Sequence, residues 1–378
     1  MTSNSGLLRR MFCLIVTSGM PLMAFGVNTP KIAPATDPFE LVTGAVQVVD
    51  TPESRAEVLR LLARARKSLA LRSAGQPYDL KVDFTVDSLG QTNYDGTWEM
   101  EDLFAPGQGL RWTAKAAAGY HITAISSKGE LYTEGTASAI PLRLHEVRGL
   151  LFDPIPSTAY ASLGSIRTSG ATFHGATVTC VLLSRSRNAS NPALGRGWEE
   201  TEECIDLQSG LLRMHSEVPG RYAVYDYSNA PQLGDHILPR AVTVTEAGRI
   251  VSTISVESLQ AISTADPSLF APSDAMKAGP ATVMTSARKI SRLQGQGPFT
   301  SAMTARPVCV FGMVTSTGQL VEAHSLQPSD PNSQAAVEDA KRIDFSPTIP
   351  GAVAPLLPPA ARPRQHFVFV IEKFVSPQ

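Results

Sequence analysis

Side chains that could do chemistry are few and scattered along this 378-residue sequence. His145 and Glu146 come nearest to an acid–base pair, but neighbours in a helix point about 100° apart, so we expect both on a solvent-facing helix surface. No Gly-x-Ser-x-Gly, Gly-x-x-x-x-Gly-Lys or His-Glu-x-x-His motif occurs. We therefore predict no catalytic, cofactor-binding or metal-binding residues. A hydrolase with a dispersed site stays open as an alternative, because triads are defined by geometry and not by sequence position.

The cysteines predict one disulfide. Cys13 belongs to a predicted signal peptide, which leaves Cys180, Cys204 and Cys309 in the mature chain. Cys180 and Cys204 lie in successive strand-like runs on either side of one polar loop, whereas Cys309 lies beyond a predicted linker. We therefore predict a bond between Cys180 and Cys204, with Cys309 as the odd thiol. Closing a loop of about 25 residues in this way is worth roughly 3 kcal/mol.

The first residues have the pattern of a secretory signal. Arg9 and Arg10 precede an apolar run from Met11 to Phe25, which is shorter than the roughly 20 residues that a spanning helix needs. Ala24 and Gly26 place small side chains where signal peptidase requires them. We predict a signal peptide over residues 1–26 that is cleaved after Gly26, and hence a periplasmic or secreted protein. An uncleaved signal would instead anchor the chain in the inner membrane.

Composition narrows the class of partner. Apolar residues make up 43% of the chain, which is enough to bury cores in more than one domain. The 33 basic residues nearly balance the 34 acidic ones, and no dense run of Lys or Arg occurs. The sequence therefore predicts a globular protein without a nucleic-acid partner.

Residues 40–275 are expected to form a β domain with few helices. A helix is predicted from Thr51 to Leu71 and a second from Pro141 to the residue before Pro154. Strands are predicted by alternation, with Trp98 in the core, at 80–86, 97–103, 109–116, 120–126, 130–133, 177–183, 200–205, 211–217, 222–227, 240–246 and 250–259. The predicted fold is α+β, with an antiparallel, curved half-barrel covered by helices. An apolar or lipid ligand would suit its concave face, although ordinary core packing explains the same residues.

Residues 276–296 have little periodicity and are predicted to be a linker, after which a small α/β domain covers 297–378. Its predicted order is strand, strand, helix, strand. This pattern resembles the C-terminal domain of TonB-type energy transducers, through Val308 to Val314, Gly318, Leu320 to Leu326, Ala335 with Ala336, Phe345 with Pro347, and Phe367 to Phe374. The resemblance implies pairing with a strand of an envelope protein, for example an outer-membrane transporter peptide, by β-augmentation. The strand implied is Phe367, Val368, Phe369, Val370 and Ile371.

The β domain resembles the LolA and LolB lipoprotein-carrier superfamily. The features that carry the resemblance are the helix at Thr51 to Leu71, the turn at Asp206, Ser209 and Gly210 before Leu211, Leu238 with Pro239, and Asp266 with Ser268, Leu269 and Phe270. The resemblance implies a cavity for acyl chains. The leading hypothesis is a periplasmic, non-catalytic binding protein, and the alternative is a TonB-type transducer, anchored in the inner membrane, that energises outer-membrane transport.

Overall fold

The computed structural model describes residues 46–87, 95–127, 130–136, 142–157, 164–184, 200–246, 248–263, 265–280, 285–294, 304–315, 318–345 and 365–376. The chain divides into two units, 1–34 and 35–378, and every described residue belongs to the second. The predicted signal peptide and its cleavage site lie outside the described residues. Within the described part of the chain, no helix combines the length and the apolar character needed to cross a membrane.

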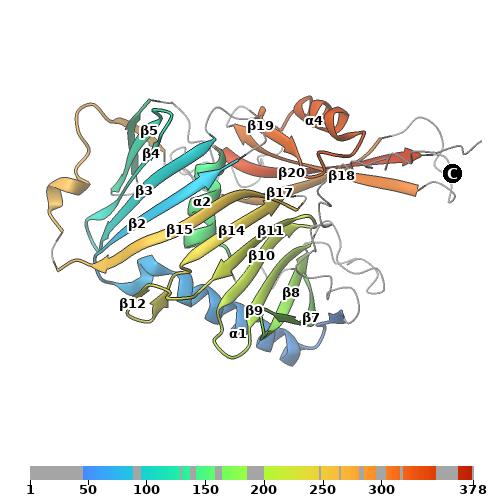
Figure 1. Cartoon of the computed structure of the whole chain (residues 1–378), viewed down its shortest axis with the longest axis horizontal. Coiled ribbons are helices and arrows are strands. Elements are labelled where there is room, and N and C mark those ends of the chain that lie inside the picture. The colour runs from blue at the N-terminus through green and yellow to red at the C-terminus, as the bar shows by residue number, and fades with distance from the viewer. Residues whose placement is uncertain are drawn as a thin grey trace, which may run out of the picture. The chain divides into compact units, whose positions relative to one another are not determined.

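One large antiparallel sheet contains most of the strands (Figure 1). Its order is β1-β7-β8-β9-β10-β11-β14-β15-β2-β3-β4-β5-β6-β16. The strands are β1 (Gln47–Val48), β2 (Tyr78–Val86), β3 (Gly96–Ala105), β4 (Gly109–Ala116), β5 (His121–Ser127), β6 (Glu130–Gly135), β7 (Ser165–Phe173), β8 (Ala176–Ser184), β9 (Thr201–Asp206), β10 (Leu212–Val218), β11 (Arg221–Asp226), β14 (Ala241–Glu246), β15 (Arg249–Ala261) and β16 (Lys277–Pro280). A separate hairpin pairs β12 (Gln232–Leu233) with β13 (His236–Ile237). The α+β class and its antiparallel sheet are as predicted.

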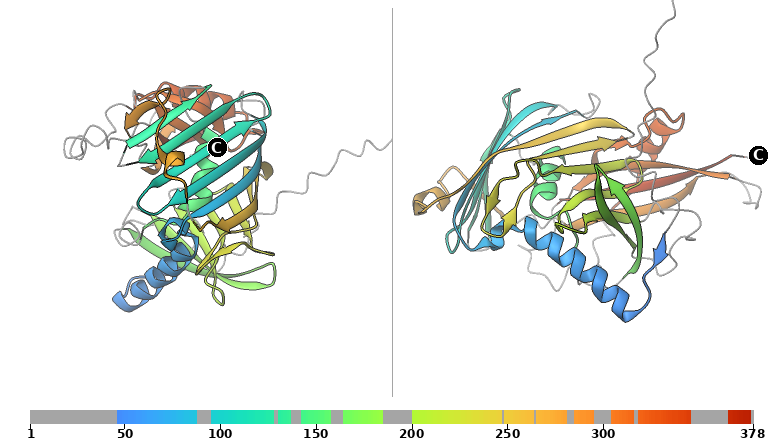
Figure 2. Two further views of the ribbon diagram at one scale, coloured as in Figure 1. Left: turned by 90° about the vertical axis from the view of Figure 1, so that its left-hand side faces the viewer. Right: turned by 60° about the horizontal axis from the view of Figure 1, so that its bottom comes forward.

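Alternation along the strands gives the large sheet one apolar face. In β2, Leu80, Val82 and Phe84 are buried, while Lys81 and Asp83 between them are exposed. The sheet is curved, and α1 and α2 lie against the same side of it (Figure 2). We call this side the inner face and the opposite side the outer face.

The two predicted helices of the β domain are confirmed. Helix α1 (Pro52–Leu69) begins after Thr51, whose Oγ1 accepts a hydrogen bond of 3.2 Å from the backbone N–H of Ser54, and Pro52 occupies the first turn, where no N–H is needed. A short 3₁₀ helix, η2 (Leu71–Ala74), follows it. Helix α2 (Leu142–Phe152) ends two residues before Pro154, which cannot continue a helix. A second 3₁₀ helix, η4 (Pro267–Phe270), follows β15.

The C-terminal residues form a second sheet in the order β17-β20-β18-β19. Its elements are β17 (Thr285–Gln294), β18 (Thr304–Thr315), β19 (Leu320–Ser325), α4 (Ser333–Lys341) and β20 (Gln365–Ser376). Helix α4 packs Ala336 and Ala340 against Val308 and Val310 of β18. The predicted order of strand, strand, helix and strand is confirmed as an element order.

Two predictions for this region are wrong. Residues 276–296 contain β16, which pairs with β6, and β17, which runs parallel to β20, so this segment is not a structureless linker. Its strands are held by backbone pairing at sheet edges, which requires no apolar alternation. Because β17 covers one side of β20 and β18 covers the other, the strand Phe367–Ile371 is interior and does not offer an open edge to a partner. The domain boundary near residue 296 stays a prediction.

The predicted disulfide between Cys180 and Cys204 is present. The two residues are direct register partners on β8 and β9, and both side chains lie on the outer face with Val178 and Leu182. Cys309 is a buried thiol on β18. The bond therefore joins neighbouring strands of the large sheet.

Replacing Cys180 and Cys204 together by alanine is expected to lower the free energy of unfolding by about 3 kcal/mol, because the bond closes a loop of 24 residues in the unfolded chain. Urea unfolding measures the loss. Cys309→Ala, which removes a buried thiol without removing a crosslink, is the control. A loss no greater than that of Cys309→Ala would contradict the prediction.

Candidate functional site

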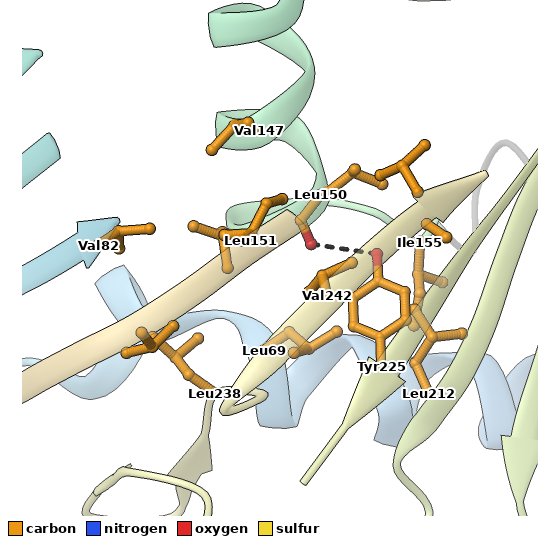
Figure 3. Close-up of a cluster of buried hydrophobic side chains, with 14 of the residues drawn as sticks. Leu69, Val82, Val147, Leu150, Leu151, Ile155, Leu212, Tyr225, Leu238 and Val242 are labelled. Atoms are coloured by element: carbon orange, nitrogen blue, oxygen red, sulfur yellow. Dashed lines mark hydrogen bonds between the residues drawn. The ribbon is translucent and has the colours of Figure 1, made fainter. Parts of the chain in front are cut away.

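The inner face of the large sheet and the helices on it form the main apolar cluster. Leu69 from α1 and Val147, Leu150 and Leu151 from α2 pack against strand residues (Figure 3). The hydroxyl of Tyr225 donates a hydrogen bond of 3.2 Å to the backbone carbonyl of Leu150, as the dashed line in Figure 3 shows. The labelled strand and loop residues around them are Val82, Ile155, Leu212, Leu238 and Val242. Helix α2 therefore packs directly against the inner face of the sheet.

Arg148 ties α2 to one half of this face. Its guanidinium lies 3.1 Å from Asp102 on β3 and stacks over the Trp112 ring at 4.2 Å from the ring centre. The hydroxyl of Tyr78 donates to the other oxygen of Asp102 at 3.0 Å. Burial lowers the pKa of Arg148 to about 10, and the Asp102 carboxylate opposes that shift. Arg148 therefore keeps its charge at neutral pH.

At its other end α2 meets a group of charged side chains that we call the charged cluster. Its members are Arg143 and Glu146 from α2, Glu203 from β9, His215 and Glu217 from β10, Arg221 from β11, Glu246 from β14 and His324 from β19. All are buried except Glu217, which is partly exposed. The cluster joins the large sheet, α2 and the C-terminal sheet.

Glu246 is the centre of the charged cluster. Its carboxylate accepts hydrogen bonds of 2.8 and 3.1 Å from Arg143, one of 3.0 Å from Nε of Arg221, and one of 2.8 Å from Nε2 of His324. Burial by itself would raise the pKa of Glu246, but Arg143 and His324 hold this pKa well below its usual range. Glu246 is therefore an ionised acceptor shared by three elements.

Arg221 extends the cluster in two directions. It pairs with Glu146 on α2 and, at 2.6 Å, with Glu217 on β10. Its guanidinium also lies over the ring of Phe311 on β18, 4.4 Å from the ring centre. Breaking such a buried network by removing one partner costs several kcal/mol, so these contacts hold the parts in one arrangement.

His215 lies between two carboxylates. Its Nδ1 is 3.4 Å from Glu203, and its Nε2 is 3.4 Å from Glu217. Burial would lower the pKa of His215, but Glu217 and Glu203 together raise it to about 10. His215 is therefore an imidazolium at neutral pH.

Glu203 is fully buried, and among the described residues neither of its oxygens has a hydrogen-bond partner. The same holds for Nδ1 of His215 and for Oγ1 of Thr201, two residues before Glu203 on β9. The register pairs Glu203 with Val181 and Thr201 with Leu183, both of which belong to the apolar cluster of the inner face. Since buried polar atoms are almost always satisfied, these atoms mark a place where a donor group or water belongs.

Most of these residues are not those that the sequence singled out. His145 and Glu146 are both buried, so the predicted solvent-facing surface is wrong. Helix α2 lies in the interior, where Arg143 and Arg221 neutralise Glu146. Trp98 is in the core, as predicted. In the part of the chain that is described, metal-ligand types gather at Cys180, Glu202 and Cys204, but the disulfide occupies both sulfurs.

Several solved structures are distantly similar to this chain. A DUF1329 family protein from Desulfovibrio piger has 9% identity and a TM-score of 0.37, over 57% of this chain and 96% of its own. A LolA superfamily protein from Nitrosomonas europaea has 10% identity and a TM-score of 0.33, over 56% and 96%. MucB in a complex with MucA from Pseudomonas aeruginosa has 12% identity and a TM-score of 0.28, over 70% and 82%. Scores this low establish neither a shared fold nor a shared function. No protein-family model and no curated protein matches the sequence.

The free energy of unfolding is expected to fall as pH rises from about 6.5 to about 10. The pKa of His215 is about 10 in the folded protein and about 6.5 in the unfolded chain, so the folded state binds the proton more tightly. This preference contributes its full stabilisation below pH 6.5, and the contribution is lost as the pH rises to about 10. The loss is about 5 kcal/mol for His215. Urea unfolding at several pH values measures it.

His215→Gln should flatten this dependence, because the amide does not titrate. His121→Gln, at an exposed histidine of β5, is the matched control and should keep the slope of the unaltered protein. Equal slopes in both variants would show that His215 does not carry the effect.

Proposed function

We propose that this protein is a non-catalytic binding protein of the bacterial envelope that holds an apolar ligand between α2 and the inner face of the large sheet. The envelope location rests on the signal-like pattern of Arg9, Arg10 and the apolar run that follows. The ligand class rests on the inner face itself, and the sequence resemblance to lipoprotein carriers agrees with it.

One observation carries the proposal. Phe104, Leu110 and Leu131 lie in one cross-strand row of the inner face, with Ser126 between the last two. All three are only partly buried, as is Phe152 at the end of α2, and they are continuous with the buried apolar cluster. An apolar surface that runs from solvent into the interior is a route for an apolar ligand, whereas a closed core has none.

Helix α2 is held to the sheet by two kinds of contact, and a ligand would replace only the apolar kind. The C-terminal half of α2 makes apolar contacts through Val147, Leu150 and Leu151, while Arg143 and Arg148 hold the helix to the sheet by ion pairs. Each methylene of a ligand buried beneath α2 would contribute about 0.8 kcal/mol, so a chain of about twelve carbons gains enough to survive purification.

No observation on the described residues favours either alternative, the TonB-type transducer or the hydrolase. A TonB-type transducer would use the strand Phe367–Ile371, which β17 and β18 enclose on both sides. A hydrolase would need a reachable acid–base pair, and the pair of His324 with Glu246 is buried beside Arg143.

Protein purified from cells without detergent is expected to carry apolar ligand, which native mass spectrometry detects as added mass. After removal of that ligand, it should take up a fluorescent fatty acid at micromolar concentration. Leu110→Asp should weaken uptake by about tenfold or more, because it places a charge on the proposed route.

Leu207→Asp makes the same change at an exposed site and should leave uptake unaltered. Absence of bound mass together with absence of uptake would identify the interior as a packed core and end the proposal.

A further inference from the structure

We infer that the inner face carries a subsite at Glu203, Thr201 and His215 that binds the ammonium head of an amphiphile. This rests on the proposed function, since the apolar part of the same molecule would lie against the interior. It adds the chemical class of the ligand: a cationic amine with an apolar chain.

The subsite contains buried acceptors that no aligned donor reaches among the described residues, since Nδ1 of His215 lies 3.4 Å from Glu203 without forming a hydrogen bond to it. Among the residues described, the two oxygens of Glu203 and Oγ1 of Thr201 have no hydrogen-bond partner, although all three atoms are buried. Glu203 and Thr201 are two apart on β9, so both side chains point to the inner face. An ammonium group brings three N–H donors and no acceptor, which matches the three oxygens.

Charge favours the same ligand. Glu146, Glu217 and Glu246 each pair with a guanidinium of Arg143 or Arg221. Glu203 has no guanidinium among the described residues, and its contact with His215 at 3.4 Å is not aligned as a hydrogen bond. Among the described residues, Glu203 shares the His215 imidazolium with Glu217, so these three groups carry a net charge of −1, which favours a cationic head group over an anionic one.

Apolar side chains adjoin the subsite. The register places Val181 and Leu183 of β8 beside Glu203 and Thr201, while Ile205 and Leu212 continue the inner face along β9 and β10. An alkyl chain attached to the ammonium can therefore leave the subsite along apolar surface. The geometry fits an amphiphile better than a free small amine, which would bury only its head.

The test compares probes that differ only in the head group. Dodecylammonium, dodecanol and dodecanoate are titrated into ligand-free protein at neutral pH, below their micelle concentrations, by calorimetry. Dodecylammonium is expected to bind about tenfold or more tightly than dodecanol, since charge-assisted hydrogen bonds replace neutral ones, and dodecanoate should bind most weakly.

Glu203→Gln should reduce the preference for dodecylammonium over dodecanol to nearly one, because the amide has the same shape without the charge. Glu202→Gln changes the next residue, which is also buried but lies on the outer face, and should keep the preference of the unaltered protein. Circular dichroism checks both folds, and if Glu203→Gln does not fold, the order of the probes in the unaltered protein decides.

The outcomes separate the two claims. Equal binding of the probes, or tightest binding of dodecanoate, would overturn the ammonium subsite and leave the apolar interior standing. Binding of none of them would overturn both. An unchanged preference in a folded Glu203→Gln variant would also remove Glu203 from the subsite.

Discussion

The carboxylate of Glu246 is the point at which three parts of the described structure meet. Arg143 reaches it from α2, Arg221 from the neighbouring strand β11, and His324 from the C-terminal sheet. A buried charge is tolerated only when it is paired, so each of these elements depends on the others for its place. The result is a helix fixed across the inner face by the ion pairs of Arg143 and Arg148 and by the apolar packing of Val147, Leu150 and Leu151. Because ion pairs share in holding α2, the helix can cover the apolar face without relying on apolar packing alone.

The polar and apolar parts of the inner face then have different roles. Alternation along β2 and the strands beside it produces the apolar surface, and the part-buried row of Phe104, Leu110 and Leu131 brings it to solvent. The charged cluster adjoins the same apolar surface, because Val181, the register partner of Glu203, belongs to it. Glu203 differs from the other carboxylates of the charged cluster in that neither of its oxygens has a hydrogen-bond donor among the described residues. An interior with an apolar surface and a buried carboxylate suits a molecule that has an apolar chain and a cationic head group.

The sequence predicts the local elements well because their signals are local. Thr51 followed by Pro52 marks the start of α1, strict alternation marks β2, and Cys180 and Cys204 flank one loop of the same sheet. It does not predict β7 or β17, whose small and polar residues are held by pairing with other strands. Nor does it predict the charged cluster, because His324 and Glu246 are 78 residues apart in the sequence. Glu202 and Glu203 lie on opposite faces of β9 and are both buried, and the residues around them in the sequence do not indicate that both faces are covered. Such contacts depend on strand order, which periodicity alone leaves open.

The most direct test of the account is a crystal structure of the protein after purification from cells without detergent. The account predicts continuous elongated density along the inner face beside Leu150 and Val82, with its polar end within hydrogen-bond distance of Glu203. Side chains in mutual contact throughout this region, with at most isolated waters at Glu203, would contradict it. In that case the inner face is an ordinary core, and α2 is one of its layers.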